Sequence, residues 1–174
     1  MKKINHTYFL TVTAISIALV YVFTAFINIR LPLVANGGLI HLGNVPLFIV
    51  AMLYGKKVGA LAGGVGMGFF DLLSGWTVWA PFTLVIVGLM GYTIGSICEK
   101  HSSYSAKIIS MTLACAIKII GYYFAESIIY GNFLVPISSI PGNLVQIGIA
   151  SIIVITVIEP LSKAVSRLNA TVSA

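Results

Sequence analysis

Long apolar stretches with almost no charged side chains follow one another along the chain, and this pattern constrains the fold more than any other feature. The first of them covers residues 7–29 without an acidic or basic side chain. Hydrophobic residues make up 59% of the 174 residues and charged residues only 8%, whereas soluble domains carry about 25% charged residues. So few charged side chains cannot cover a water-facing surface, and the sequence therefore predicts an integral membrane protein. Its length fits a single domain over residues 1–174.

The apolar stretches divide into segments of the length that a membrane helix needs. Crossing the hydrocarbon core takes roughly 20 apolar residues, with a range of about 17–25. Six segments come close to this length: residues 7–28, 39–54, 58–73, 78–98, 107–129 and 137–158. We therefore expect an all-α membrane protein with six transmembrane helices. The second and third segments are short and rich in glycine, which leaves open whether each forms one continuous helix.

The basic residues give the expected helices a direction. Six crossings put both termini on one side, and most basic residues fall on that same side: Lys2, Lys3, Lys56, Lys57, Lys100, Lys107, Lys163 and Arg167. Arg30 falls on the other side, and Lys118 lies within the fifth segment. The positive-inside rule therefore predicts cytoplasmic termini in a multi-pass protein of the bacterial plasma membrane type. Because the basic residues form no stripe, nucleic acid is not an expected partner.

The longest loop on the expected outer side covers residues 29–38 and contains Pro32, Gly37 and Gly38. It could fold as a cap over an outward-facing cavity, with the two glycines as a hinge. It could equally be a plain connector.

Four ionisable side chains fall within or beside the apolar segments: His41, Asp71, Lys118 and Glu126. An ionisable residue at membrane depth costs roughly 2.5–3.5 kcal/mol on insertion scales, so each one is a candidate functional residue. Lys118, Tyr122 and Glu126 are spaced i, i+4 and i+8, which places them on one stripe of a helix. The alternative is that Lys118 and Glu126 pair with charges on other helices and only hold the bundle together. Asp71 could receive donor groups of a ligand, neutralise Lys118, or lie at the wet interface.

Polar side chains also begin the second segment and the sixth. His41 and Asn44 could contact a ligand or merely cap a helix start. Asn143 and Gln146 are spaced i, i+3 and share one helix face, where they could bind a ligand or hydrogen-bond between helices.

Trp76 and Trp79 lie at the expected outer boundary, where they could join the interfacial belt or stack on a flat ligand. The carboxylates, amides and aromatic rings gather in the outer half, which suits a small, flat, polar solute better than an ion. No catalytic, ATP-binding or metal-ligand spacing stands out, so we expect neither an enzyme nor a bound cofactor or metal.

Small residues at i, i+4 form flat strips along several segments. The strip of Ala14 and Ala18 in the first segment could receive a helix of another protein. The glycine pairs at positions 59 and 63, 64 and 68, and 91 and 95 are expected to pack inside the bundle.

Taken together, the chain resembles the S components of energy-coupling factor (ECF) transporters. The strings that carry the resemblance are His41-Leu-Gly-Asn44-Val-Pro46, Gly64-x-Gly66-x-Gly68-x-x-Asp71-Leu-Leu and Pro141-Gly-Asn143-x-x-Gln146. They are similar to the subfamily that binds hydroxymethylpyrimidine, pyridoxine or riboflavin. The resemblance covers nearly the whole chain.

The resemblance implies a six-helix fold with a vitamin bound near the outer side, hydroxymethylpyrimidine or pyridoxine being favoured. It implies a transmembrane coupling subunit and two cytoplasmic ATPase subunits as partners, with Ala14 and Ala18 contacting the coupling subunit. The substrate-binding residues it suggests are Glu126, Asn143 and Gln146, together with Tyr122, His41, Asn44, Asp71 and Trp79. The alternative is a free-standing secondary transporter or channel with Asp71, Lys118 and Glu126 along its path.

Overall fold

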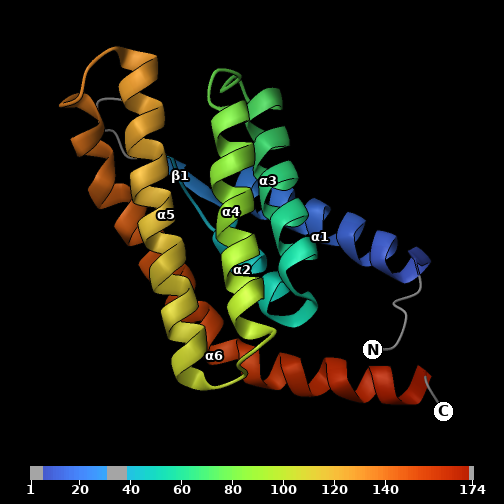
Figure 1. Cartoon of the computed structure of the whole chain (residues 1–174). Helices are drawn as coiled ribbons and strands as arrows, with labels where there is room; N and C mark the ends of the chain where they lie inside the picture. Colours follow the sequence, from blue (N-terminus) through green and yellow to red (C-terminus); the bar gives the residue numbers. More distant parts are fainter. Residues whose placement is uncertain (1–5, 31–38, 173–174) are drawn as a thin grey trace.

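The structure is a computed structural model that describes residues 6–30 and 39–172. Six α-helices and two short strands make up most of the described chain (Figure 1). In chain order the elements are α1 (His6–Phe26), β1 (Asn28–Arg30), β2 (Leu39–His41), α2 (Asn44–Tyr54), α3 (Lys56–Leu73), α4 (Ala80–Cys98), α5 (Tyr104–Tyr130), the 3-10 helix η1 (Val135–Ser139) and α6 (Ile140–Val172). The predicted all-α class is confirmed, with the strand pair as the one addition within the described residues.

Four helical segments of the described chain are long and apolar enough to cross a membrane: His6–Phe26, Ala80–Cys98, Tyr104–Tyr130 and Val135–Arg167. Helix α3 has 18 residues and is continuous through its glycines, but it carries Lys56, Lys57 and Asp71. Helix α2 has 11 residues, which gives a length of about 16 Å against a hydrocarbon core of roughly 30 Å. The count of six crossings and the cytoplasmic termini therefore remain predictions.

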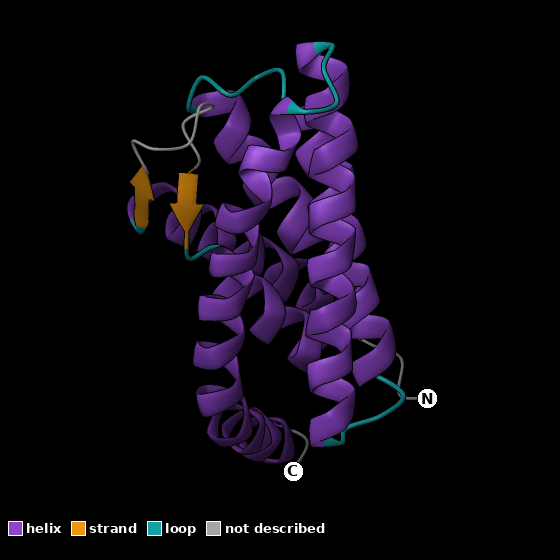
Figure 2. Cartoon of the chain, turned by 90° about the vertical axis from the view of Figure 1, so that its left-hand side faces the viewer, coloured by secondary structure: helices purple, strands orange, loops and turns teal. Residues whose placement is uncertain are grey.

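The segment expected as the second helix is only partly helical. Residues Leu39–His41 form strand β2, which pairs antiparallel with β1 so that Asn28 lies opposite His41. The predicted helix over residues 39–54 was therefore wrong at its start, because this pairing fixes an extended backbone up to His41. Figure 2 shows the strand pair at the side of the helical bundle. The expected cap with its Gly37–Gly38 hinge falls mostly on residues 31–38, outside the described residues.

Helix α2 lies at the centre of the bundle and packs against α1, α3, α4 and α6. Most of its side chains are buried, among them Leu47, Phe48, Val50 and Ala51. A short apolar helix can take this position because the longer helices around it separate it from lipid.

Helices α3 and α4 pack through glycines on both sides of their contact. A Cβ atom added to Gly91 would lie 2.2 Å from the carbonyl oxygen of Gly59, and one added to Gly63 would lie 2.9 Å from that of Val87. At the end of this contact, the backbone N–H of Lys56 donates to Oε1 of Glu99 over 2.9 Å. The expectation that the glycine strips pack inside the bundle is confirmed for α3 and α4.

Helix α6 contains Pro160. Proline removes one backbone hydrogen bond and its ring clashes with the preceding turn, so it bends a helix. Figure 1 shows the last part of α6 turning away from the direction of α5.

Candidate binding site

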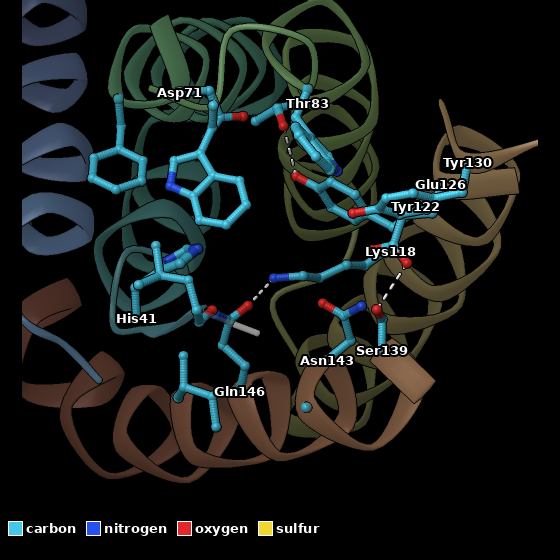
Figure 3. A pocket seen from close by; sticks show the side chains of 16 residues that line it. His41, Asp71, Thr83, Lys118, Tyr122, Glu126, Tyr130, Ser139, Asn143 and Gln146 are labelled. Carbon is cyan, nitrogen blue, oxygen red and sulfur yellow. Dashed lines mark hydrogen bonds between the residues drawn. The ribbon is translucent and has the colours of Figure 1, made fainter. Parts of the chain in front are cut away.

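A cavity lies between the strand pair and helices α3 to α6. Its walls come from six elements and from the loop between α3 and α4, and they are formed by Leu39, Ile40, His41, Phe70, Asp71, Trp76, Trp79, Thr83, Lys118, Tyr122, Glu126, Tyr130, Ser139, Gly142, Asn143 and Gln146. Figure 3 shows side chains from helices far apart in the sequence pointing into this space. Seven of the eight predicted substrate-binding residues line it, the exception being Asn44.

Helix α5 contributes its predicted stripe to the cavity wall. Lys118, Tyr122 and Glu126 all face the cavity, as their i, i+4, i+8 spacing predicts. Two of them are held by hydroxyl groups: the Tyr122 hydroxyl lies 2.9 Å from that of Thr83, and Ser139 donates to Oε2 of Glu126 over 2.8 Å. One face of α5 is thus fixed from α4 on one side and from η1 on the other.

The Gln146 side chain connects four elements at the deep end of the cavity. Its Oε1 accepts hydrogen bonds from the Lys118 ammonium and, over 3.1 Å, from Nδ2 of Asn44. Its Nε2 donates to the carbonyl oxygen of Leu39 in β2 over 3.0 Å. Gln146 therefore ties α6 to α2, α5 and the strand pair.

Asn44 lies behind this wall and not in it. Its side chain is fully buried, and its Oδ1 has no hydrogen-bond partner within the described residues. Asn44 therefore helps to orient Gln146, and its direct contact with a ligand stays a prediction.

Lys118 is 3% exposed, and its ammonium lies 5.9 Å from the centre of the Tyr122 ring. Neither Lys118 nor Glu126 takes part in the ion pairs found among the described residues. The alternative in which these two charges hold the bundle through interhelical salt bridges is therefore not observed in this part of the chain. Both charges instead face the cavity.

Asp71 and His41 complete the polar lining. Asp71 lies near the end of α3, close to Thr83 (Figure 3). His41 lines the cavity, and its Nδ1 also accepts from the backbone N–H of Gly43 over 3.2 Å. His41 thus lines the cavity and supports the turn before α2, while its contact with a ligand stays a prediction.

Aromatic rings form the wall nearest the loop between α3 and α4. The Trp76 and Trp79 rings meet edge to face with centres 5.3 Å apart, and the Tyr130 ring lies 6.0 Å from that of Trp79. Phe70 adds a further ring. Such a wall can hold a flat ring by stacking and edge contacts.

Several lining residues were not predicted from the sequence, among them Phe70, Thr83 and Ser139. Thr83 is a hydroxyl within an apolar helix, which is a weak signal because such hydroxyls usually bond to their own helix. Ser139 lies four residues before Asn143, so its proximity to the predicted amide pair was the available clue.

Ala14 and Ala18 lie on the exposed face of α1, remote from the cavity. The buried face of the same helix carries Thr13, Ser16 and Val20. The small-residue strip is thus open to the surroundings, as an interface for another helix requires.

The fold and the cavity define a class: a helical membrane protein with a cavity lined by polar and aromatic side chains. The family described as "ECF-type riboflavin transporter, S component" matches residues 4–163, and the chain belongs to this family. It is accordingly a vitamin-type S component, which is a transporter subunit and not an enzyme. The chain is itself a multi-pass protein of the bacterial plasma membrane type.

Two relatives extend the comparison. The "Thiamine precursor transporter HmpT" of Lactococcus lactis subsp. cremoris is 28% identical over 160 residues, which cover 92% of this chain and 90% of that protein. An uncharacterised protein of Pyrococcus woesei is 33% identical over 103 residues, which cover 59% of this chain and 69% of that protein.

Proposed function

We propose that the chain captures hydroxymethylpyrimidine, a thiamine precursor, on the outer side of the membrane and delivers it inward. The delivery would be driven by a transmembrane coupling subunit and two cytoplasmic ATPase subunits, since ECF S components in general work with such modules. The observation that carries the proposal is the cavity itself, in which carboxylates, amides and a lysine face an aromatic wall. The relative that transports a thiamine precursor supports this choice of ligand.

The functional groups of hydroxymethylpyrimidine match those of the cavity. Its exocyclic amine and its hydroxymethyl group are donors that Glu126 and Asp71 can accept. Its ring nitrogens are acceptors for the ammonium of Lys118 and the amide of Asn143. The flat ring suits the wall of Trp76, Trp79 and Tyr130, and a few polar groups in an aromatic cavity are typical of small-molecule sites.

The two charges on α5 favour a ligand with separate donor and acceptor groups. Lys118 and Glu126 are eight residues apart on one helix, which separates their Cα atoms by about 12 Å along its axis. A ligand between them would present acceptors toward Lys118 and donors toward Glu126. Pyridoxine also carries both kinds of group, and the family description names riboflavin, so both belong in the test.

The test is a binding panel on the purified full chain without nucleotide. We expect tight one-to-one binding of hydroxymethylpyrimidine by calorimetry, with pyridoxine and riboflavin weaker by at least tenfold, which is about 1.4 kcal/mol. Mass spectrometry of the small molecule that co-purifies with the protein gives an independent answer. Preferential binding of riboflavin or pyridoxine would overturn the choice of ligand.

The requirement for partners needs a separate assay. Vesicles that contain this chain alone should bind the ligand but not accumulate it, whereas vesicles with the coupling and ATPase subunits should accumulate it when ATP is supplied. Accumulation by the chain alone, driven by an ion gradient, would instead support the free-standing secondary transporter.

A further inference from the structure

A second cavity lies at the opposite end of the bundle, between α6 and the ends of α2, α4 and α5. The turns after α2 and after α4 lie at this end, in the lower part of Figure 1. Met52, Leu53 and Ile158 form an apolar part of its wall, while Lys107, Glu159 and Lys163 form a charged part. This cavity shares no residue with the site described above.

The charged part consists of one carboxylate between two ammonium groups. Nζ of Lys107 lies 3.7 Å from Oε1 of Glu159, and Nζ of Lys163 lies 4.0 Å from its Oε2. Both distances are longer than a charge-assisted hydrogen bond of roughly 2.7–2.9 Å. The Lys107 side chain is 14% exposed, so its charge is held within the cavity wall. One carboxylate cannot neutralise two lysines, and the group keeps a net positive charge.

Lys163 lies one turn after Glu159 on α6, which places both side chains at this cavity. Pro160 lies inside the helix one residue after Glu159, and Ser162 and Lys163 also line the cavity. The charged group is therefore built from two segments, the start of α5 and the bend of α6.

The protein surface around the second cavity has more basic than acidic side chains and also exposes apolar side chains. Within residues 39–172 this end of the bundle has six basic side chains against the carboxylates of Glu99 and Glu159: Lys56, Lys57, Lys100, Lys107, Lys163 and Arg167. Next to the lysines, Ile108, Ile109 and Leu161 are exposed on the outer surfaces of α5 and α6. Basic pockets between membrane helices, with apolar surface beside them, suit lipids with anionic head groups.

We propose that this second cavity binds the phosphate of an anionic phospholipid between Lys107 and Lys163, with the acyl chains along the exposed apolar surfaces of α5 and α6. Glu159 competes with the phosphate for the two lysines. The positive-inside rule predicts this end to be cytoplasmic, and the cytoplasmic leaflet is the one that carries a negative surface potential. The site does not depend on which ligand the outer cavity takes.

The test uses the full chain in detergent, titrated with phosphatidylglycerol or with phosphatidylcholine of the same acyl chains. Lipid binding is followed by native mass spectrometry and by the midpoint of thermal unfolding. Phosphatidylglycerol should bind more tightly than phosphatidylcholine and raise the midpoint further. The double variant Lys107→Gln/Lys163→Gln should weaken phosphatidylglycerol binding by about tenfold or more, since each lysine near the surface contributes on the order of 1 kcal/mol.

The matched control is Lys57→Gln/Lys100→Gln, which removes the same charge from the same end without touching the cavity wall. It should retain most of the phosphatidylglycerol affinity. The variant Glu159→Gln should bind phosphatidylglycerol several-fold more tightly, because the competing carboxylate is gone. A purely structural salt bridge would give no such gain. If the double variant fails to fold, the single variant Lys163→Gln takes its place, because that side chain is 74% exposed.

Three results would overturn the proposal: equal effects of the two double variants, equal binding of the two lipids, or weaker phosphatidylglycerol binding by Glu159→Gln. Inorganic phosphate is titrated separately without lipid. If it stabilises the protein as phosphatidylglycerol does, and with the same dependence on Lys107 and Lys163, the site takes a free anion and the lipid assignment is wrong.

Discussion

Two pairs of consecutive helices in this protein pack in opposite ways. In the pair α3–α4 the backbones touch, and glycine carbonyl and Cα atoms fill the positions where side chains would stand. The pair α5–α6 packs far less closely, with the candidate binding cavity at one end and the lysine-lined cavity at the other. The glycine-packed pair leaves no space between its backbones, and the open pair leaves room for the polar side chains that line the cavity.

Because the two pairs pack differently, glycine has a packing role in the pair α3–α4 that it does not have in α6. A Cβ atom at Gly91 or Gly95 would lie within 2.4 Å of backbone atoms of the facing helix, whereas one at Gly148 in α6 meets nothing within 4 Å. Close backbone approach through small residues is a common way for membrane helices to associate. Along α6, glycine has no such packing role.

The largest expected effect is a loss of stability when the close contact between α3 and α4 is disrupted. Gly91→Ala forces α3 and α4 apart, and overpacking of this kind costs typically 1–3 kcal/mol and at times more. The matched control Gly148→Ala should be neutral or stabilise the helix by roughly 0.5–1 kcal/mol, because alanine is the better helix former and has open space there. Thermal unfolding in detergent measures both, and equal shifts in the same direction would contradict the contrast between the two pairs.

The second prediction concerns the pair α5–α6 and the removal of one negative charge from its cavity. Glu126→Gln keeps the shape of the side chain but loses the negative charge that faces the ligand. We expect ligand affinity to fall by at least tenfold, about 1.4 kcal/mol. Calorimetry measures the loss, with Glu159→Gln in the other cavity as the charge-matched control that should leave this affinity unchanged. Full affinity in Glu126→Gln would remove this carboxylate from the site.

A smaller effect is expected where α4 meets α5. Thr83→Val replaces a hydroxyl by a methyl group of similar size and leaves the Tyr122 hydroxyl without its partner at 2.9 Å. A hydrogen bond of this kind contributes about 0.5–1.5 kcal/mol, so affinity should fall by roughly two- to tenfold. The variant Thr13→Val on α1, whose hydroxyl bonds only to its own helix, should leave the affinity as in the wild type.

The smallest effect on the purified protein is expected on the exposed face of α1. Ala14→Leu and Ala18→Leu lie outside both pairs, so ligand affinity and thermal stability should change little. In vesicles with the coupling and ATPase subunits, however, the larger side chains should block uptake by preventing close helix approach. Normal uptake with leucine at both positions would exclude this face as the contact with the coupling subunit.

Much of the site could be predicted because an ionisable or amide group at membrane depth is costly and therefore stands out in an apolar sequence. Glu126, Lys118 and Asp71 were found in this way, and the helical period of α5 placed Tyr122 beside them. Thr83 could not be found in the same way. The hydroxyls of Thr13 and Thr24 bond to carbonyls of their own helix, and nothing in the local sequence distinguishes Thr83, whose hydroxyl meets Tyr122.

The start of the second segment illustrates the same limit. Leu39–His41 read as the first turn of an apolar helix, but the pairing of this stretch with Asn28–Arg30 makes it a strand. The partner strand lies about ten residues earlier, so the local sequence carries no sign of the pairing. The supporting role of Asn44 was missed for the same reason, since its partner Gln146 lies 102 residues later.

The sequence by itself determined the membrane class, the approximate helices, the stripe on α5 and the family resemblance, because each depends on apolar content, local period or short motifs. The tertiary structure decided which helices pack closely and which loosely, how Gln146 joins four elements, and that two separate cavities flank α6. These features depend on contacts between residues remote in the chain, and only the packed backbone fixes the space that remains between them.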